Sequence, residues 1–270
     1  MGPFLVFAAA FMVAPTIMLA WQSVSGADGF TLDYIYALGG GTFRSAAYNS
    51  VMLSVASATV GVVCGGAIAA VVFHRKAPPV LGAIATSFSA VAANFAGVPL
   101  AFAFIASLGM SGLLTRALKA LGIDIYATGF TLYSLGGLTI IYAYFLIPLM
   151  VIIITPAIQA LRVEWSEAAE SLGATPWQYL RLVVVPILAP SLVSAFILLF
   201  GSAFSGYATA YALTSGNLLL LTTEIGNVLS GDVMNSPQTG AALSVSMIAV
   251  MVGVVAASNL FMRRARRWQS

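Results

Sequence analysis

Six apolar runs, each close to the ~20 residues that an α-helix needs to cross ~30 Å of hydrocarbon, constrain this chain more than any other feature. They lie at about 3–21, 47–73, 80–108, 134–156, 187–212 and 240–262. Only 7% of the 270 residues are charged, against roughly 25% in soluble domains. Such runs are too long and too free of charge for half-exposed surface helices. The sequence therefore predicts an all-α integral membrane protein, a single domain over 1–270 with six transmembrane helices.

The first run could be read as a cleaved signal peptide. It lacks a basic n-region and leads straight into Trp21, a residue type that anchors helix ends at the membrane interface, so we expect 3–21 to be a span. It begins so close to residue 1 that a longer, basic segment could precede it. The single cysteine, Cys64, excludes an intramolecular disulfide and is expected to be a small packing residue.

The loops between the runs differ in charge, and this difference orients the chain, because cytoplasmic loops carry an excess of Lys and Arg. With the N-terminus inside, eight of the eleven basic residues are cytoplasmic: Arg75, Lys76, Arg162, Arg181, Arg263, Arg264, Arg266 and Arg267. The outside keeps Arg44, Arg116 and Lys119, alongside Asp28, Asp33, Asp124, Glu224 and Asp232. We therefore expect both termini to be cytoplasmic.

One cytoplasmic loop, about 157–186, has a definite pattern of residues that start and end helices. The residues before Gly173 favour a helix, and this glycine is well placed to follow it in the left-handed conformation that glycine adopts at low cost. Thr175 can cap a second helix, with Pro176 at its first position and Gln178 completing a T-x-x-Q capping box. The sequence predicts a helix, a sharp turn and a second helix.

The first of these two helices has features of a docking element. Ala168 and Ala169 give it a slim face that another protein can approach closely, and Glu167 offers a carboxylate to a basic partner. Glu-Ala-Ala by itself is common in helices. Here it belongs to a longer pattern, with a glycine three residues later and a Val-x-Val-Pro segment nine residues after that: Glu167, Ala168, Ala169, Gly173, Val183, Val185 and Pro186.

This pattern resembles the EAA motif, EAA-x3-G-x9-I-x-L-P, of ABC importer permeases, with Val in place of the usual Ile and Leu. The resemblance is sharpest over 155–190, and the layout of six spans agrees over nearly the whole chain. It implies a type I importer permease in a prokaryotic plasma (inner) membrane, whose loop docks on a separate ATPase as a coupling helix. Residues 170–174 are more similar to the polyamine, phosphonate, ferric-iron, sulfate and thiamine group than to the sugar group.

The resemblance also implies partners: a second permease, similar or identical, two ATPase subunits and an extracytoplasmic solute-binding protein, with no role for nucleic acid. The chain contains no G-x-x-x-x-G-K-[ST] phosphate-binding loop, so ATP and Mg are expected on the partner ATPase and no cofactor on this chain. His74 is the sole histidine and lies beside Arg75 and Lys76, where an interfacial anchor is expected. No catalytic or metal-binding constellation is predicted.

A few polar side chains inside the runs are candidates for a translocation path: Asn94, Ser202, Ser205, Tyr207 and Tyr211. Polar groups in hydrocarbon need partners, so hydrogen bonds between helices are the plainer explanation for these residues. The two tyrosines could instead anchor helix ends at the outer interface. Gly61, Gly65 and Gly66 are expected to be close-packing points, and Gly61 and Gly65 have the small-xxx-small spacing.

Two outer segments have helical patterns. Residues 111–123 place apolar side chains at helical spacing, with Arg116 and Lys119 on another face, which predicts a short helix at the membrane surface. Residues 213–234 predict either a lid packed on the spans or a contact surface for the binding protein, with Glu224 and Asp232 as contact candidates.

The predicted function is that of a permease subunit that forms half of the path of an ATP-driven importer of a small polar solute. A polyamine or an aminoalkylphosphonate is favoured by the motif alone. The chief alternative is a secondary transporter or channel, which would need coupling-ion carboxylates or a pair of broken helices within the membrane, and the sequence indicates neither. A membrane-embedded enzyme is a third hypothesis, which the lack of a His/Asp/Glu constellation disfavours.

Overall fold

The structure is a computed structural model that describes residues 2–26, 29–74, 77–127, 129–230 and 237–266. Those residues form helices joined by short loops, with one antiparallel pair of two-residue strands, β1 (Ser25–Gly26) and β2 (Gly29–Phe30). The helices are α1 (Gly2–Ala8), η1 (Ala9–Val13), α2 (Ala14–Gln22), α3 (Asp33–Ala37), α4 (Gly41–Val60), η2 (Gly61–Gly65), α5 (Gly66–Val72), α6 (Pro79–Asn94), α7 (Val98–Leu108), α8 (Leu113–Ala120), α9 (Leu135–Gln159), α10 (Val163–Ser171), α11 (Pro176–Tyr179), η3 (Leu180–Val184), α12 (Val185–Phe204), α13 (Tyr207–Thr214), α14 (Leu221–Leu229) and α15 (Pro237–Arg266). The three η elements are π-helical segments that continue into α-helix.

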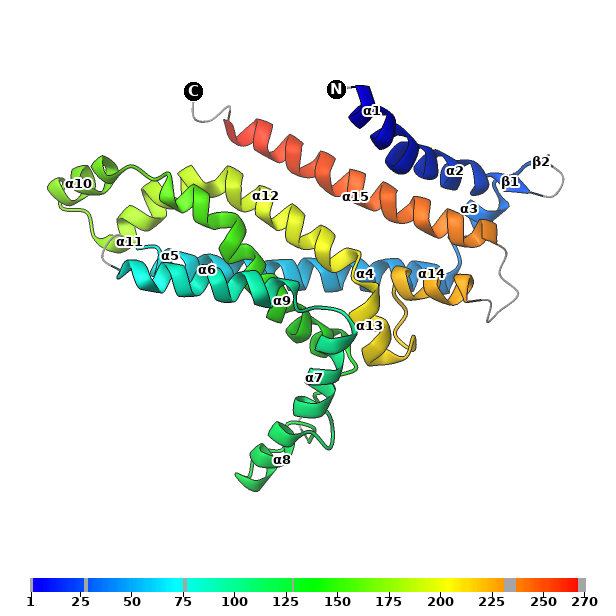
Figure 1. The fold of residues 1–270 in the computed structure, drawn as a ribbon, viewed down its shortest axis with the longest axis horizontal. Coiled ribbons are helices and arrows are strands. Elements are labelled where there is room, and N and C mark those ends of the chain that lie inside the picture. The colour runs from blue at the N-terminus through cyan, green and yellow to red at the C-terminus, as the bar shows by residue number, and fades with distance from the viewer. Residues whose placement is uncertain (1, 27–28, 75–76, 128, 231–236, 267–270) are drawn as a thin grey trace.

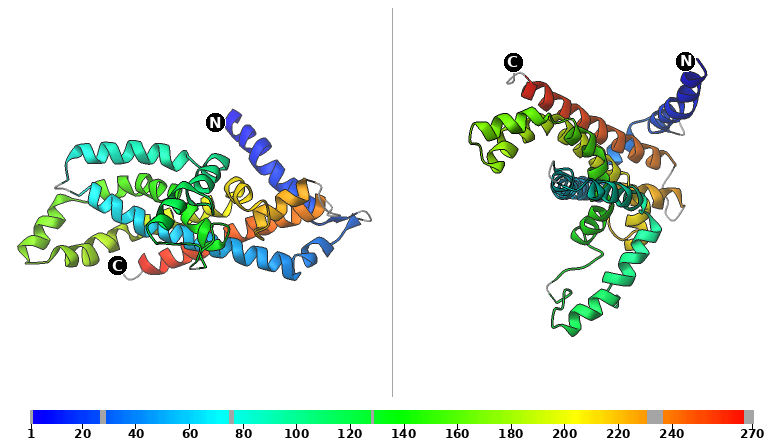
Figure 2. Two further views of the ribbon diagram at one scale, coloured as in Figure 1. Left: turned by 90° about the horizontal axis from the view of Figure 1, so that it is seen from below. Right: turned by 60° about the vertical axis from the view of Figure 1, so that its left-hand side comes forward.

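Six helical stretches of the described chain are long and apolar enough to cross a membrane: Pro3–Gln22, Gly41–Val72, Val98–Ala120, Leu135–Gln159, Pro176–Phe204 and Pro237–Leu260. The molecule is elongated, with α10 and α11 at one end and α3, α14 and the β1–β2 pair at the other (Figure 1). The views in Figure 2 show the same two ends far apart. We refer to them as the α10 end and the α14 end. The predicted all-α class with six candidate spans is confirmed.

The core forms around α9, the helix that contacts α4, α6 and α12. The η2 segment packs so closely on α9 that it requires glycine at two positions. A Cβ atom at Gly61 would lie 2.6 Å from Leu199 Cδ2, and one at Gly65 would lie 2.6 Å from both Ile147 O and Met150 Cβ. The prediction of close packing is confirmed for Gly61 and Gly65 but wrong for Gly66, whose Cβ would meet only Met150 Cε at 3.8 Å.

Two of the expected spans are interrupted. The run at 80–108 divides into α6 and α7, with Phe95–Gly97 between them, and the run at 187–212 divides into α12 and α13, with Ser205 and Gly206 between them. The first interruption contacts the helix that follows the second, since Gly97 N donates to Thr209 Oγ1 of α13 at 2.8 Å. Both breaks lie just outside the candidate spans, which begin at Val98 and end at Phe204, so the expectation of no broken helix pair within the membrane stays a prediction. Glycines at both breaks were the available signal, but glycine is also common in continuous membrane helices.

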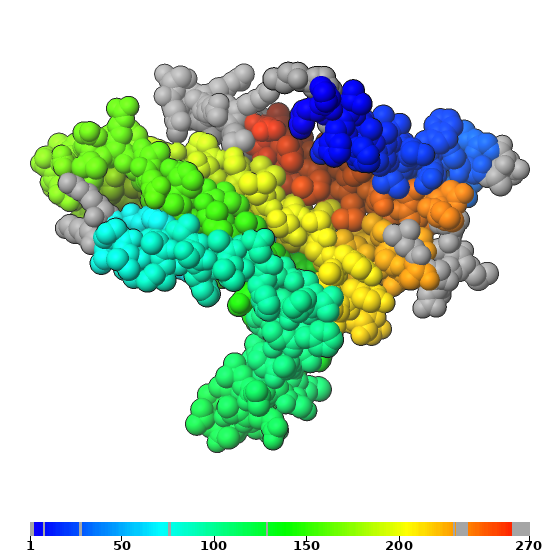
Figure 3. Space-filling view, in the orientation of Figure 1, coloured from blue at the N-terminus to red at the C-terminus, as the bar shows by residue number. Residues whose placement is uncertain are grey.

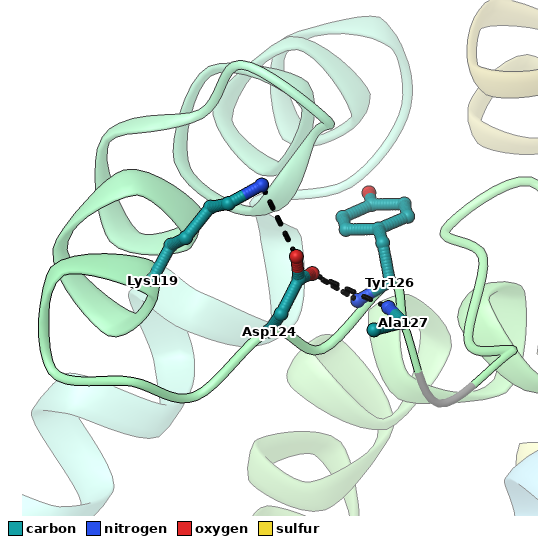
Figure 4. A network of polar contacts seen from close by, with 4 residues as sticks. All are labelled: Lys119, Asp124, Tyr126 and Ala127. Atoms are coloured by element: carbon teal, nitrogen blue, oxygen red, sulfur yellow. Dashed lines mark hydrogen bonds and ion pairs between the residues drawn. The ribbon is translucent and has the colours of Figure 1, made fainter.

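Beyond the first break, α7 and α8 form an arm that stands clear of the rest of the molecule in the space-filling view (Figure 3). The expected helix at 111–123 is present as α8, which ends before Leu121. Its C-terminal turn is held by Asp124, whose carboxylate lies 3.1 Å from Lys119 Nζ and accepts from the backbone N–H groups of Tyr126 and Ala127 (Figure 4). The hydrogen bond from Lys119 holds the pKa of the Asp124 carboxyl below its ordinary value.

At the opposite end, α14 is fastened to α4 by side chains that cap backbone groups. Ser50 Oγ accepts from Leu221 N at 2.9 Å, and Asn49 Nδ2 donates to Leu219 O at 3.1 Å. Buried backbone groups need such partners. The segment at 213–234, expected to be a lid or a contact surface, therefore begins as a structure packed on the spans; its residues 231–234 lie outside the described residues.

Candidate functional site

The first half of the 157–186 loop ends in the turn that the sequence predicted. Gly173 has φ +74°, in the left-handed region. Gly173 N donates to Glu170 O, and Ala174 N donates to Ala169 O, both at 3.0 Å. These two bonds make a Schellman motif, which satisfies the last carbonyls of α10 and reverses the chain.

The second half begins with the predicted capping box. Gln178 N donates to Thr175 Oγ1 at 3.3 Å, and Thr175 N donates to Gln178 Oε1 at 2.7 Å. Pro176 is the first residue of α11. The helix then passes through the π segment η3 into α12, where Pro186 lacks the N–H that a regular helix would use. One uninterrupted stretch, Pro176–Phe204, thus connects this loop to the second helix break.

The loop is exposed over most of its surface. Glu167 and Ala168 are exposed and Ala169 is half-buried. Large apolar side chains are exposed beside them: Leu172 is 87% accessible and Trp177 is 67% accessible. An exposed apolar patch of this kind at the tip of a projecting turn is typical of a surface that binds another protein.

The polar residues proposed for a translocation path bond within their own helices. Asn94 Nδ2 donates to Ala90 O at 2.8 Å, and Ser205 Oγ donates to Gly201 O at 2.9 Å. Ser202 is half-buried, and its carbonyl accepts a longer bond from Ser205 Oγ at 3.4 Å. Asn94 and Ser205 are both exposed and flank the two helix breaks, at the last residue of α6 and just after α12. The hydrogen bonds between helices that were the alternative explanation are not made by these two side chains.

Tyr207 and Tyr211 lie on α13 with their ring centroids 5.2 Å apart. They are 37% and 40% accessible. The Tyr207 ring packs against α14, since a Cβ at Gly226 would lie 2.6 Å from Tyr207 Cε2. Tyr207 therefore joins two outer helices and still presents an edge at the surface.

Thr209, a further polar residue of the fifth run, makes the hydrogen bond between helices that was the plainer explanation, whereas Gly97, Tyr142 and Gly206 had no place in the sequence-based site. Thr209 is buried and bonds to Gly97, whose φ of +78° favours glycine. Tyr142, in α9, is also buried, and its hydroxyl donates to Gly206 O at 2.5 Å. Tyr142 and Gly206 are 64 residues apart, so only the tertiary structure reveals this contact.

The two outer carboxylates proposed to contact a binding protein have different outcomes. Glu224 lies in the first turn of α14 and is half-buried. Its burial raises the pKa of the carboxyl above its ordinary value. Asp232 lies outside the described residues.

The family model described as "Binding-protein-dependent transport system inner membrane component" matches residues 61–269. The chain belongs to this family. It is an ABC importer permease, so it is a transport subunit and not an enzyme, as the EAA pattern predicted. Nothing in these comparisons supports a secondary transporter or channel.

Two relatives show how this permease compares with others. It is 31% identical over 137 residues to the sulfate transport system permease protein CysT of Escherichia coli K12, which covers 50% of this chain and 49% of CysT. The chain thus aligns with about half the length of that relative. It is 21% identical over 264 residues to the spermidine/putrescine transport system permease protein PotC of the same strain, covering 94% of this chain and 91% of PotC.

The fold of the permease matches a solved structure. A crystal structure of a bacterial ABC transporter involved in the import of the acidic polysaccharide alginate contains a chain that superposes with a TM-score of 0.77. The match covers 97% of this chain and 93% of that chain at 19% sequence identity. The predicted permease fold is confirmed.

Proposed function

We propose that this permease forms half of a transmembrane path and is driven by a separate ATPase that docks on the 157–186 loop. The observation that carries the proposal is the turn between α10 and α11, around which Glu167, Leu172 and Trp177 are all exposed. A rigid, capped turn loses little conformational freedom on binding. A displacement of this turn by a bound partner would therefore be transmitted to α12 with little local rearrangement.

The remaining partners follow from the family. A second permease, similar or identical, would complete the path, and an extracytoplasmic binding protein would deliver solute at the α14 end, where Glu224 is a contact candidate. ATP and Mg would be held by the two ATPase subunits. Closure of the ATPase dimer would bring the two loops together and turn the path outward, in the manner of alternating access.

For the solute we propose a small polar organic molecule, with a polyamine favoured over an aminoalkylphosphonate. The match to PotC, which extends over 94% of this chain, supports the polyamine. The path candidates Asn94, Ser202, Ser205, Tyr207 and Tyr211 carry no charge. Selection would accordingly be made mainly by the binding protein, with Tyr207 and Tyr211 at most stacking on or hydrogen-bonding a passing solute.

Glu167→Lys tests the docking role. We expect this charge reversal to reduce ATPase stimulation in the purified assembly at least ~10-fold, because like charges across an interface cost several kcal/mol. The permease should reach the membrane at its normal level, since no span is changed. The matched control is Glu164→Lys, an exposed acid one turn earlier in α10 and outside the motif. Equal stimulation in both variants would overturn the proposal.

A second experiment tests the orientation of the chain. In a Cys64→Ala background, a cysteine at Ser166 in α10 should react with an impermeant maleimide only from the cytoplasm. A cysteine at Ser230, the residue that ends α14, should react only from outside. Reaction of both positions from the same side would contradict an inside location of the N-terminus together with six spans.

A further inference from the structure

We infer that Tyr142 is a positioning residue for transport: its hydroxyl holds the break between α12 and α13 open, and its release lets the two helices join into one. The inference rests on the proposed function, because it holds that a movement started by the ATPase at the 157–186 loop, which we call the docking loop, is completed at this break. Tyr142 acts through Gly206, to whose carbonyl its hydroxyl donates.

The backbone at the break has a specific form that can be undone by one rotation. Gly206 has φ −72° and ψ 77°, and Tyr207 N donates to Ser205 O at 2.9 Å, which together make an inverse γ-turn. The φ value is already close to that of an α-helix, about −63°. A change in ψ of Gly206 alone, to about −42°, would give this residue a helical conformation.

Tyr142 opposes that rotation. Gly206 is the N-cap of α13, and its carbonyl accepts from the Tyr142 hydroxyl, which ties the start of α13 to α9 while the break is present. The Tyr142 side chain is buried, so its hydroxyl needs a partner, and the Gly206 carbonyl supplies it. The site is also shaped around glycine, since a Cβ at Gly206 would lie 2.8 Å from the Tyr142 hydroxyl oxygen and 3.2 Å from Ala203 O.

The elements on the two sides of the break connect to different parts of the molecule. α12 continues back through η3 and α11 to the docking loop. α13 is tied to the other break through Thr209 and Gly97, and its Tyr207 ring packs on Gly226 of α14. Straightening at Gly206 would therefore move the α7 and α14 regions relative to α12. Hinges of this kind absorb a transition in one or two residues.

The test measures the distance across the break. Spin labels are placed at Ser194 in α12 and Ser215 after α13, two exposed positions, in a Cys64→Ala background of the assembled transporter in lipid nanodiscs. A continuous helix would separate these residues by ~32 Å along its axis, at 1.5 Å per residue. We expect a shorter distance at rest with Tyr142 present. Tyr142→Phe should raise the proportion of the ~32 Å population about 10-fold, as expected for the loss of one buried hydrogen bond.

Tyr144→Phe is the matched control, because it removes the same atom from the same helix while keeping the ring that packs on Phe95 and Phe104. If Tyr142→Phe accumulates poorly, Gly206→Ala replaces it, since alanine favours the helix and its Cβ would displace the Tyr142 hydroxyl. A distance distribution that is the same in the Tyr142 or Gly206 variant as in Tyr144→Phe would overturn the inference.

The role in transport is tested in the same sample by trapping with ATP and vanadate. The unmodified break should then shift to the longer distance, and no shift would contradict a role for Tyr142 release in the cycle. A separate variant tests the proposed function. If Gly173→Pro still showed the nucleotide-induced shift in distance, the 157–186 loop would not couple the ATPase to the spans, and the proposed function would be contradicted. A loss of folded protein alone would lower the signal without creating a second, discrete distance.

Discussion

Gly173→Pro is expected to abolish ATP-driven transport while leaving the six spans in the membrane. Gly173 has φ +74°, whereas proline fixes φ near −65°, so the turn between α10 and α11 cannot form. Proline also removes the N–H that bonds to Glu170 O. With the turn lost, α10 no longer presents Glu167 in a fixed orientation relative to α12. We expect ATPase stimulation in the purified assembly to fall by at least ~100-fold, since a cost of ~3 kcal/mol is typical of proline at an incompatible site.

Gly173→Asn provides the control for this experiment. Asparagine is the residue that most often replaces glycine at left-handed helix ends, so the turn should persist and stimulation should stay within ~3-fold of the unmodified protein. If Gly173→Pro retained normal stimulation, the conformation of this turn would have no part in coupling. If Gly173→Asn failed as badly as proline, the side chain and not the backbone would be responsible.

Gly65→Ala is expected to lower the amount of folded permease. The added Cβ would lie 2.6 Å from Ile147 O and from Met150 Cβ, and neither atom is the end of a flexible side chain. Overpacking typically costs roughly 1–3 kcal/mol. Alanine offsets ~1 kcal/mol of this cost through its higher helix propensity. The substitution is therefore destabilising when the neighbouring atoms cannot move, as here. The measurement is the yield of monodisperse protein after extraction, together with its thermal midpoint.

The adjacent glycine gives an internal comparison. A Cβ at Gly66 would meet only Met150 Cε, at 3.8 Å, an ordinary contact. Gly66→Ala should therefore be neutral or slightly stabilising through helix propensity. A midpoint for Gly65→Ala equal to that of Gly66→Ala would mean that α9 can move away from this stretch at little cost.

Much of the docking loop could be predicted from the sequence because its structure is local. Gly173, Thr175 and Gln178 act on backbone groups within five residues of themselves, so short-range capping rules were sufficient. The number of candidate spans was predictable for a similar reason, since length and apolar content decide whether a helix can cross a bilayer. Gly61 and Gly65 were also recognisable, because their spacing is a pattern within one helix.

The helix breaks could not be predicted in this way, because long-range contacts decide them. Thr209 and Gly97 are 112 residues apart, and Tyr142 and Gly206 are 64 apart. A hydropathy window averages 80–108 and 187–212 into two apolar runs, and it cannot show where a carbonyl finds a partner on another helix. The same limit applies to Ser50, whose bond to Leu221 connects positions 171 residues apart.

The uninterrupted stretch from Pro176 to Phe204 has a mechanical consequence. Its 29 residues make a rod ~43 Å long at 1.5 Å per residue, with the docking turn at one end and the break at the other. A tilt of ~5° about the docking turn would move the far end by ~4 Å, most of one helical turn of 5.4 Å. A small rotation at one end of this rod is thus multiplied by its length, so the proposed coupling to an ATPase would require no large rearrangement at the turn between α10 and α11.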